Sequence, residues 1–131
     1  MHIACRLGPD LTSISTARRY AESILANESV AGFDIVALLI TEVVTNAVFH
    51  ARTPIVMTVR VTGETIRVEV HDDDSTLPVV QRAEPYQPGG RGMAIVDALA
   101  ADWGVVSEPF QGKTVWFEMA WSPHTPEIET D

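Results

Sequence analysis

The apolar residues between positions 14 and 25 recur every three or four residues, the spacing of one face of an α-helix. This pattern predicts a helix that continues to Asn27, and the hydroxyls of Ser13, Ser15 and Thr16 are candidate caps near its start. Before it, residues 3–7 alternate briefly between apolar and polar and precede a Gly-Pro-Asp turn. They therefore predict an edge strand.

A second helix, more apolar than the first, is predicted over residues 35–51. Gly32 interrupts the chain before it, and Asp34 can cap it. Pro54 prevents it from continuing much further, because proline has no amide hydrogen to donate to a helix.

A third helix is predicted over residues 93–102. The residues predicted to share its apolar face are Ala94, Ile95, Ala98 and Leu99. Gly104 follows closely and is the expected stop at its carboxyl end.

Four segments are predicted to form strands, and the first two of them are rich in β-branched residues. They are residues 55–61, 65–70, 105–108 and 114–121. The turn at residues 62–64 contains a glycine and predicts that the first two strands form an antiparallel hairpin, and the last two strands flank a predicted turn at residues 111–113.

Residues 72–92 hold three prolines and three glycines. A loop of this length in a compact domain is usually a functional lid or a disordered linker, and its position favours a lid. Residues 122–131 are polar and acidic and predict a flexible tail, so that one domain would cover residues 1–121.

Composition narrows the class of protein. A chain of 131 residues fits one domain. Cys5 is the only cysteine, which excludes an internal disulfide and a cysteine-ligated zinc site and favours the cytoplasm. The net charge of −9 argues against binding to a nucleic-acid backbone. The uninterrupted apolar runs are far shorter than the roughly 20 residues of a membrane-spanning helix, and the first ten residues do not resemble a signal peptide.

The predicted second helix carries three polar residues at successive four-residue steps: Glu42, Asn46 and His50. Each is rotated only about 40° from the last, so one face carries all three. If this face is buried, the three side chains need partners, because an unsatisfied buried polar group costs about 1–3 kcal/mol. From spacing alone, a solvent-exposed face is an equally good interpretation.

Two further segments are candidates for a binding site. The strand ending in VEVHDDDS leads into Asp72, Asp73 and Asp74, which are typical of a solvated turn and, less often, of a metal site. The segment PGGRGMAIVDALAADWGV leads from glycines into a helix, whose free amide hydrogens can bind an anion; ordinary helix entry is the alternative.

Together with GKTVWFEM near the end of the chain, these motifs resemble, in order, those of the GHKL ATPase superfamily (gyrase, heat-shock chaperone, histidine kinase, MutL). The resemblance covers roughly residues 5–120 and is strongest to the serine kinase branch that contains RsbW and SpoIIAB. It implies an α/β two-layer sandwich, with a mixed, mainly antiparallel sheet covered on one face by three helices.

The resemblance also implies roles for residues of the helix motif. Asn46 would coordinate the Mg²⁺ that bridges the phosphates of ATP, and Glu42 would act as general base. His50 matches the histidine that ends the motif near the phosphates. The residue types agree with these roles, because an amide oxygen is a hard ligand for Mg²⁺ and a carboxylate can accept a proton.

For the nucleotide, the resemblance implies that Asp72 accepts a hydrogen bond from the adenine amino group. Thr114 would reach the same aspartate directly or through water. Asp74 stands where the family usually has a small residue beside the base. Its bulk and charge would weaken nucleotide binding.

The resemblance assigns residues 75–89 to the lid, and in the glycine motif it places Gly90 and Gly92 along the triphosphate. Arg91 can add positive charge there, and Met93 belongs to the same motif.

The function implied is that of a cytoplasmic, Mg²⁺-dependent serine/threonine kinase. Such a kinase phosphorylates an anti-anti-sigma (STAS-domain) partner, binds a sigma factor, and often forms a homodimer; neither nucleic acid nor a membrane is an expected partner. The alternative is a non-catalytic anti-sigma module with a degenerate ATP site, which Asp74 favours. A histidine kinase is disfavoured because the chain has no room for a phosphoacceptor helix pair, and a purely structural domain would require the motifs to coincide by chance.

Overall fold

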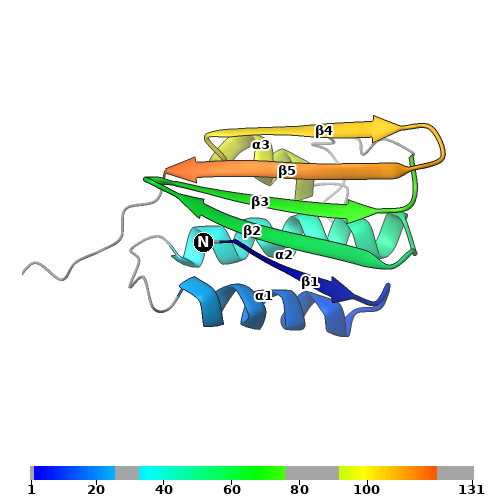
Figure 1. The fold of residues 1–131 in the computed structure, drawn as a ribbon, viewed down its shortest axis with the longest axis horizontal. Coiled ribbons are helices and arrows are strands. Elements are labelled where there is room, and N and C mark those ends of the chain that lie inside the picture. Colours follow the sequence, from blue (N-terminus) through cyan, green and yellow to red (C-terminus); the bar gives the residue numbers. More distant parts are fainter. Residues whose placement is uncertain (1, 26–32, 76–91, 121–131) are drawn as a thin grey trace, which may run out of the picture.

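The computed structural model describes residues 2–25, 33–75 and 92–120, which form one sheet and three helices (Figure 1). In chain order the elements are β1 (His2–Leu7), α1 (Thr12–Leu25), α2 (Phe33–His50), β2 (Ile55–Thr62), β3 (Thr65–Asp72), α3 (Gly92–Leu99), β4 (Asp102–Glu108) and β5 (Gly112–Ala120). The predicted lid after Ser75, the end of the first helix at Asn27, and the tail lie outside the described residues.

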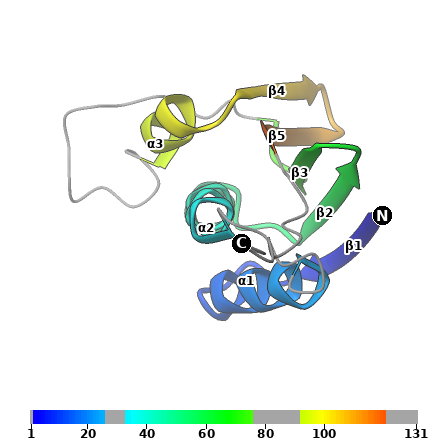
Figure 2. The same cartoon turned by 90° about the vertical axis from the view of Figure 1, so that its left-hand side faces the viewer.

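The five strands form a sheet in the order β1-β2-β3-β5-β4. Figure 2 shows all three helices on one side of it, so the predicted two-layer α/β architecture is confirmed. Every pairing between these strands is antiparallel, whereas the resemblance implied a mixed sheet.

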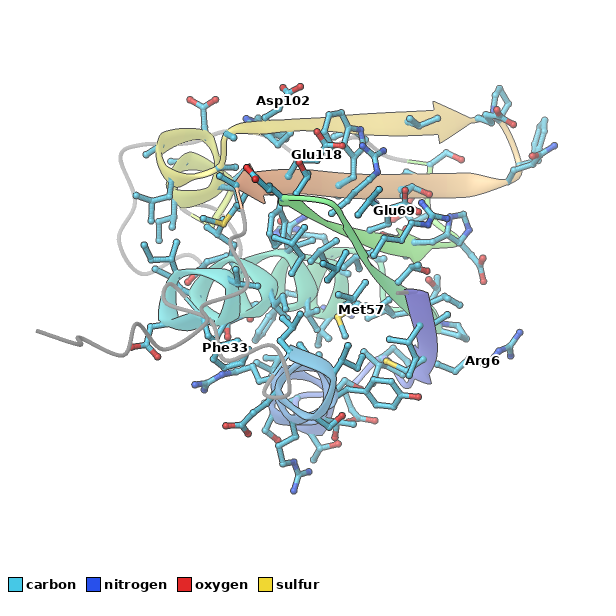
Figure 3. The ribbon with its side chains drawn as sticks, turned by 60° about the vertical axis from the view of Figure 1, so that its left-hand side comes forward. Arg6, Phe33, Met57, Glu69, Asp102 and Glu118 are labelled. Carbon is cyan, nitrogen blue, oxygen red and sulfur yellow. The ribbon has the colours of Figure 1, made fainter. Side chains whose placement is uncertain are left out.

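The core lies between the sheet and α2, the longest helix. Residues on β2 and β3 alternate between buried and less buried, which directs one set of side chains toward the helices. In Figure 3, Met57 points into this layer and Arg6 projects away from it. By length and composition α2 could also cross a membrane, but half of it is buried inside the domain, which explains its apolar sequence.

Helix α1 begins at Thr12, and its start is capped by Asp10 rather than by the hydroxyls named from the sequence. The Thr12 amide donates to Asp10 Oδ1 at 3.1 Å. Ser13 is buried inside the helix and donates to the Gly8 carbonyl, while Ser15 and Thr16 both donate to the carbonyl of Thr12. The predicted caps were therefore wrong, because the acceptor comes from the preceding turn.

Helix α3 ends at Leu99, three residues before the predicted end, because residues from Asp102 onward pair with β5. Its buried residues are Met93 and Val96, whereas Leu99 of the predicted apolar face is 45% exposed. Gly104 is not a helix stop, since it lies within β4.

The second hairpin also differs from its prediction. Its turn lies at residues 109–111, and Gly112 and Lys113 already belong to β5. Beside this turn, Ser75 Oγ donates to the Glu108 carbonyl at 3.0 Å and Ser107 Oγ donates to the Ser75 carbonyl at 2.9 Å.

The face of the sheet away from the helices carries a charged network. Glu69 accepts hydrogen bonds from Arg60 and Arg67, and Arg67 also donates to Glu118. The Arg67 guanidinium lies 4.1 Å from the centre of the Trp116 ring, a cation–π contact.

Candidate functional site

The last residue of β3, Asp72, forms a buried ion pair with Lys113 near the start of β5. The two residues are register partners, and both side chains point to the helix side of the sheet. Lys113 Nζ lies 3.1 Å from Asp72 Oδ1, and the side chains are only 2% and 1% exposed. Among the ion pairs between described residues, this is the one with both partners buried.

The chain that follows β3 folds back onto this pair. The Asp74 amide donates to Asp72 Oδ1 at 2.8 Å, and Lys113 Nζ donates to the Asp74 carbonyl at 3.0 Å. Next to them, the Asp73 amide donates to Thr53 Oγ1 at 2.9 Å. Burial raises the pKa of Asp72 above its ordinary value, and the Asp74 amide and the Lys113 charge oppose that rise.

Gly112 allows β5 to approach the end of β3. Its φ angle is +80°, and a Cβ at this position would lie 2.0 Å from the Asp72 carbonyl oxygen and 2.7 Å from Asp73 Cα. Any other residue would push the two strands apart. The Gly-Lys dipeptide therefore brings the ammonium to the carboxylate.

Asn46 is the buried polar residue of α2. Its side chain is 3% exposed, and within residues 2–25, 33–75 and 92–120 it has no hydrogen-bond partner. The helix packs against β3, and Asn46 lies among the buried residues that face the domain interior. Because an unsatisfied buried amide costs about 1–3 kcal/mol, this position is unfavourable without a ligand.

The other two polar residues of this helix differ in exposure. Glu42 is half-buried, four residues before Asn46, whereas His50 is exposed at the last position of α2. The solvent-face interpretation thus fits His50 and does not fit Asn46.

The side-chain oxygen of Asn46 fits a magnesium ion that is also bound by phosphates. A single amide oxygen suits Mg²⁺, which takes one or two protein ligands and completes its shell with phosphate oxygens and water. In the part of the chain that the structure describes, no cluster of three or more His, Cys, Asp or Glu side chains is placed to bind a metal, so the aspartate triplet does not form one.

Thr114 does not join Asp72. Its register partner is His71, and Thr114 Oγ1 lies 3.0 Å from His71 Nδ1 on the sheet face away from the helices. Successive residues of a strand point to opposite faces, so a threonine one position after Lys113 cannot share its side.

The glycine motif is described only in part. Gly92 is the first residue of α3, and the Met93 side chain is fully buried in the core, which leaves its backbone as the part that can face a ligand. Gly90 and Arg91 lie outside the described residues.

Sequence reasoning missed Lys113, which it assigned to a turn. The signal was the alternation on β5: Lys113 precedes Val115 and Phe117 by even steps, and all three are buried. A lysine in phase with core residues is rarely buried without an anionic partner.

A family model described as the histidine kinase-like ATPase domain matches residues 7–119. Among solved structures, the chain is similar to the RsbU and RsbW domains of Rv1364c from Mycobacterium tuberculosis, with a TM-score of 0.71 and 18% identity over 92% of this chain and 32% of that one. It thus spans about a third of that chain, and the likeness shows the fold. A histidine kinase domain from the blue-light activated histidine kinase of Erythrobacter litoralis EL346 matches with a TM-score of 0.44 and 30% identity, over 65% of this chain and 42% of that one. No curated protein matches significantly.

Proposed function

The chain belongs to the family of histidine kinase-like ATPase domains, and from this membership we propose that it is an ATP-binding regulatory protein that phosphorylates a serine or threonine of an anti-anti-sigma (STAS-domain) partner. The membership confirms the GHKL resemblance drawn from the motifs. The observation that supports the proposal most directly is the buried Asn46 side chain, which lacks a partner in the described part of the chain.

In this proposal each residue has a defined task at the nucleotide. Asp72 accepts a hydrogen bond from the adenine amino group, and the glycine motif around Gly92 directs backbone amides toward the phosphates. Asn46 would hold Mg²⁺, which neutralises charge on the β- and γ-phosphates when bound.

Glu42 accepts the proton of the substrate hydroxyl as that oxygen bonds to the γ-phosphorus. The bond from the γ-phosphorus to the bridging oxygen breaks, and ADP leaves with the electron pair. Half-burial suits this task, because a general base must be reachable by the partner protein yet screened from bulk water.

The test is transfer of labelled γ-phosphate from Mg·ATP to a purified STAS-domain partner protein. Wild type should transfer label, and Glu42→Gln should slow transfer by roughly 100-fold or more, within the range for a lost general base. Glu22→Gln, at an exposed position of α1, is the matched control and should keep the wild-type rate. Transfer by Glu42→Gln at the wild-type rate would refute the assignment of the base.

The second candidate function is a non-catalytic module whose affinity for a sigma factor depends on nucleotide. Asp74 favours it, because it places an acidic side chain where the family usually has a small residue beside the base. Absence of phosphate transfer together with an ATP-dependent change in sigma-factor affinity would select this function. A site weakened by Asp74 would gain affinity for ATP on Asp74→Gly.

Two further features belong to the proposal through the same family. A cytoplasmic location and a homodimer are expected, and analytical ultracentrifugation with and without Mg·ATP would test the dimer.

A further inference from the structure

We propose that Lys113 is a positioning residue that holds Asp72 as a hydrogen-bond acceptor and thereby makes the site select a 6-amino purine over a 6-oxo purine. This inference rests on the proposed nucleotide site and adds to it a residue outside the predicted set. It concerns how the base is chosen, and it is independent of whether phosphate is transferred.

The contacts of Lys113 fix both the position and the orientation of the carboxylate. Its ammonium joins Asp72 Oδ1 to the Asp74 carbonyl, at 3.1 and 3.0 Å. The Asp74 amide reaches the same oxygen, Oδ1, at 2.8 Å. Neither contact uses Oδ2, so among the hydrogen bonds between described residues the second oxygen is the one that remains to accept a hydrogen bond from a base.

The charge of Lys113 matters because the carboxylate is 1% exposed. A buried carboxylate without a counter-ion takes up a proton, since burial penalises the charged form. Of the described residues, Lys113 is the one whose cationic group forms an ion pair with Asp72.

The remaining ionisable groups on the elements next to Asp72 do not replace this cation. The cations Arg60 of β2 and Arg67 of β3 pair with Glu69 and Glu118 on the face of the sheet away from the helices, and His71 lies on that face too. On α2 lie Asp34, Glu42 and His50, and Asp73 and Asp74 follow β3; of these five groups His50 is the one that can become a cation, and it is exposed.

The two protonation states of Asp72 recognise different bases. A carboxylate only accepts hydrogen bonds, so it pairs with the amino group at position 6 of adenine. A carboxylic acid can donate, so it pairs with the oxygen at position 6 of hypoxanthine or guanine. By keeping Asp72 a carboxylate, Lys113 favours adenine and disfavours the 6-oxo bases.

The competing explanation is that Lys113 only joins the two strands. Removing Lys113 would then loosen the site and weaken the binding of every purine nucleotide to the same degree. The ratio of affinities for two bases separates the explanations, because a loosened site does not change which group of the base is preferred.

The experiment measures the Kd of Mg·ATP and Mg·ITP by calorimetry for wild type, Lys113→Met and Lys113→Arg. Wild type should bind ATP at least about tenfold more tightly than ITP, the effect of one charge-assisted hydrogen bond. Lys113→Met nearly keeps the length of the side chain and removes its charge. It should weaken ATP binding more than ITP binding, so that the ratio of the two affinities falls at least about tenfold. Lys113→Arg restores a cation and should retain a preference for ATP.

If Lys113→Met folds poorly, the double variant Lys113→Met/Asp72→Asn supplies a neutral pair of nearly the same shape. Its amide can both donate and accept, so it should bind ATP and ITP within about threefold of each other. Equal weakening of both nucleotides in Lys113→Met, with the wild-type ratio kept, would overturn the role of Lys113 while leaving the nucleotide site intact. Failure of wild type to bind either nucleotide would overturn the proposed function as well.

Discussion

Thr114 Oγ1 lies 3.0 Å from His71 Nδ1, on the opposite face of the sheet from Asp72. The residue that the family resemblance assigned to the adenine-binding aspartate thus contacts a histidine on the face away from the helices. Lys113 takes the place beside Asp72.

Thr114→Val should therefore leave nucleotide affinity within about twofold of wild type, because it changes only a partly exposed hydrogen bond. Titration of Mg·ATP measures this directly. A loss of tenfold or more would show that Thr114 acts on the Asp72 site, as the resemblance implies.

Asn46→Ala should abolish Mg·ATP binding without lowering stability. The substitution removes a buried amide that has no partner among the described residues and that costs about 1–3 kcal/mol to desolvate. We expect the free energy of unfolding in the absence of nucleotide to stay equal or to rise by about 1 kcal/mol, measured by urea denaturation.

Val44→Ala is the matched control for Asn46→Ala, since Val44 is fully buried on the same helix. It should lower the free energy of unfolding by roughly 2 kcal/mol through the cavity that it leaves. A comparable loss in Asn46→Ala would mean that its amide stabilises the fold.

Gly112→Ala should destabilise the fold and disrupt the nucleotide site together. The new Cβ would meet the Asp72 carbonyl oxygen at 2.0 Å, in a backbone conformation with φ of +80°. We expect a loss of more than about 2 kcal/mol, because a steric clash is added to the usual cost of a positive φ.

Gly63→Ala separates the clash from the backbone effect. Gly63 has a similar φ of +59°, and a Cβ there would meet nothing within 4 Å. Its loss should be about 1 kcal/mol, with nucleotide binding retained. Equal losses for the two variants in denaturant titrations would argue against the close approach of β5 to Asp72.

The ion pairs between Glu69 and the arginines Arg60 and Arg67, on the sheet face away from the helices, should give a pH-dependent contribution to stability. Glu69 is partly buried, and although burial opposes the effect, its hydrogen bonds and charge interactions with Arg67 and Arg60 lower its pKa below the ordinary 4.5. A lowered folded-state pKa means that the contribution is complete above pH 4.5 and is lost as the pH falls through the folded-state value.

Glu69→Gln should thus lower the free energy of unfolding by about 1 kcal/mol at pH 7, a modest value because the side chains remain partly exposed. The difference from wild type should shrink below pH 4.5. A difference that stays constant from pH 7 to pH 3 would exclude the ion pairs as its source.

The sequence predicted the parts of the fold whose signals are local. Helix α2 follows from a long apolar segment that ends before Pro54, and the first hairpin follows from Gly63 between two β-branched segments. The end of α3 was misplaced because Ala100 and Ala101 are good helix formers locally, whereas pairing with β5 directs the chain into β4 from Asp102 onward.

Of the candidate site, the motif residues could be predicted from the sequence, whereas their burial and pairing could not. Asp72 and Asn46 could be identified as candidates because each is a polar residue within a motif. Their burial could not, because it depends on tertiary packing. The Asp72–Lys113 pair joins residues 41 positions apart, and it depends on strand register and on the turn ending at residue 111. A one-residue shift in this register would reverse which side chains face the helices, so the place of Lys113 beside Asp72 could not be predicted from the motif alone.

The measurement that tests the central claim most directly is calorimetric titration of Mg·ATP into wild type, Asp72→Ala and Asp102→Ala. Asp102 is the matched control, because it is an exposed carboxylate at the start of β4. Its register partner on the neighbouring strand is Glu118, at the end of β5 that is far from Lys113. We predict saturable binding with one ATP per chain for wild type and Asp102→Ala, and no measurable binding for Asp72→Ala. Binding of ATP by Asp72→Ala with the wild-type affinity, or its absence in wild type, would contradict a nucleotide site at the end of β3.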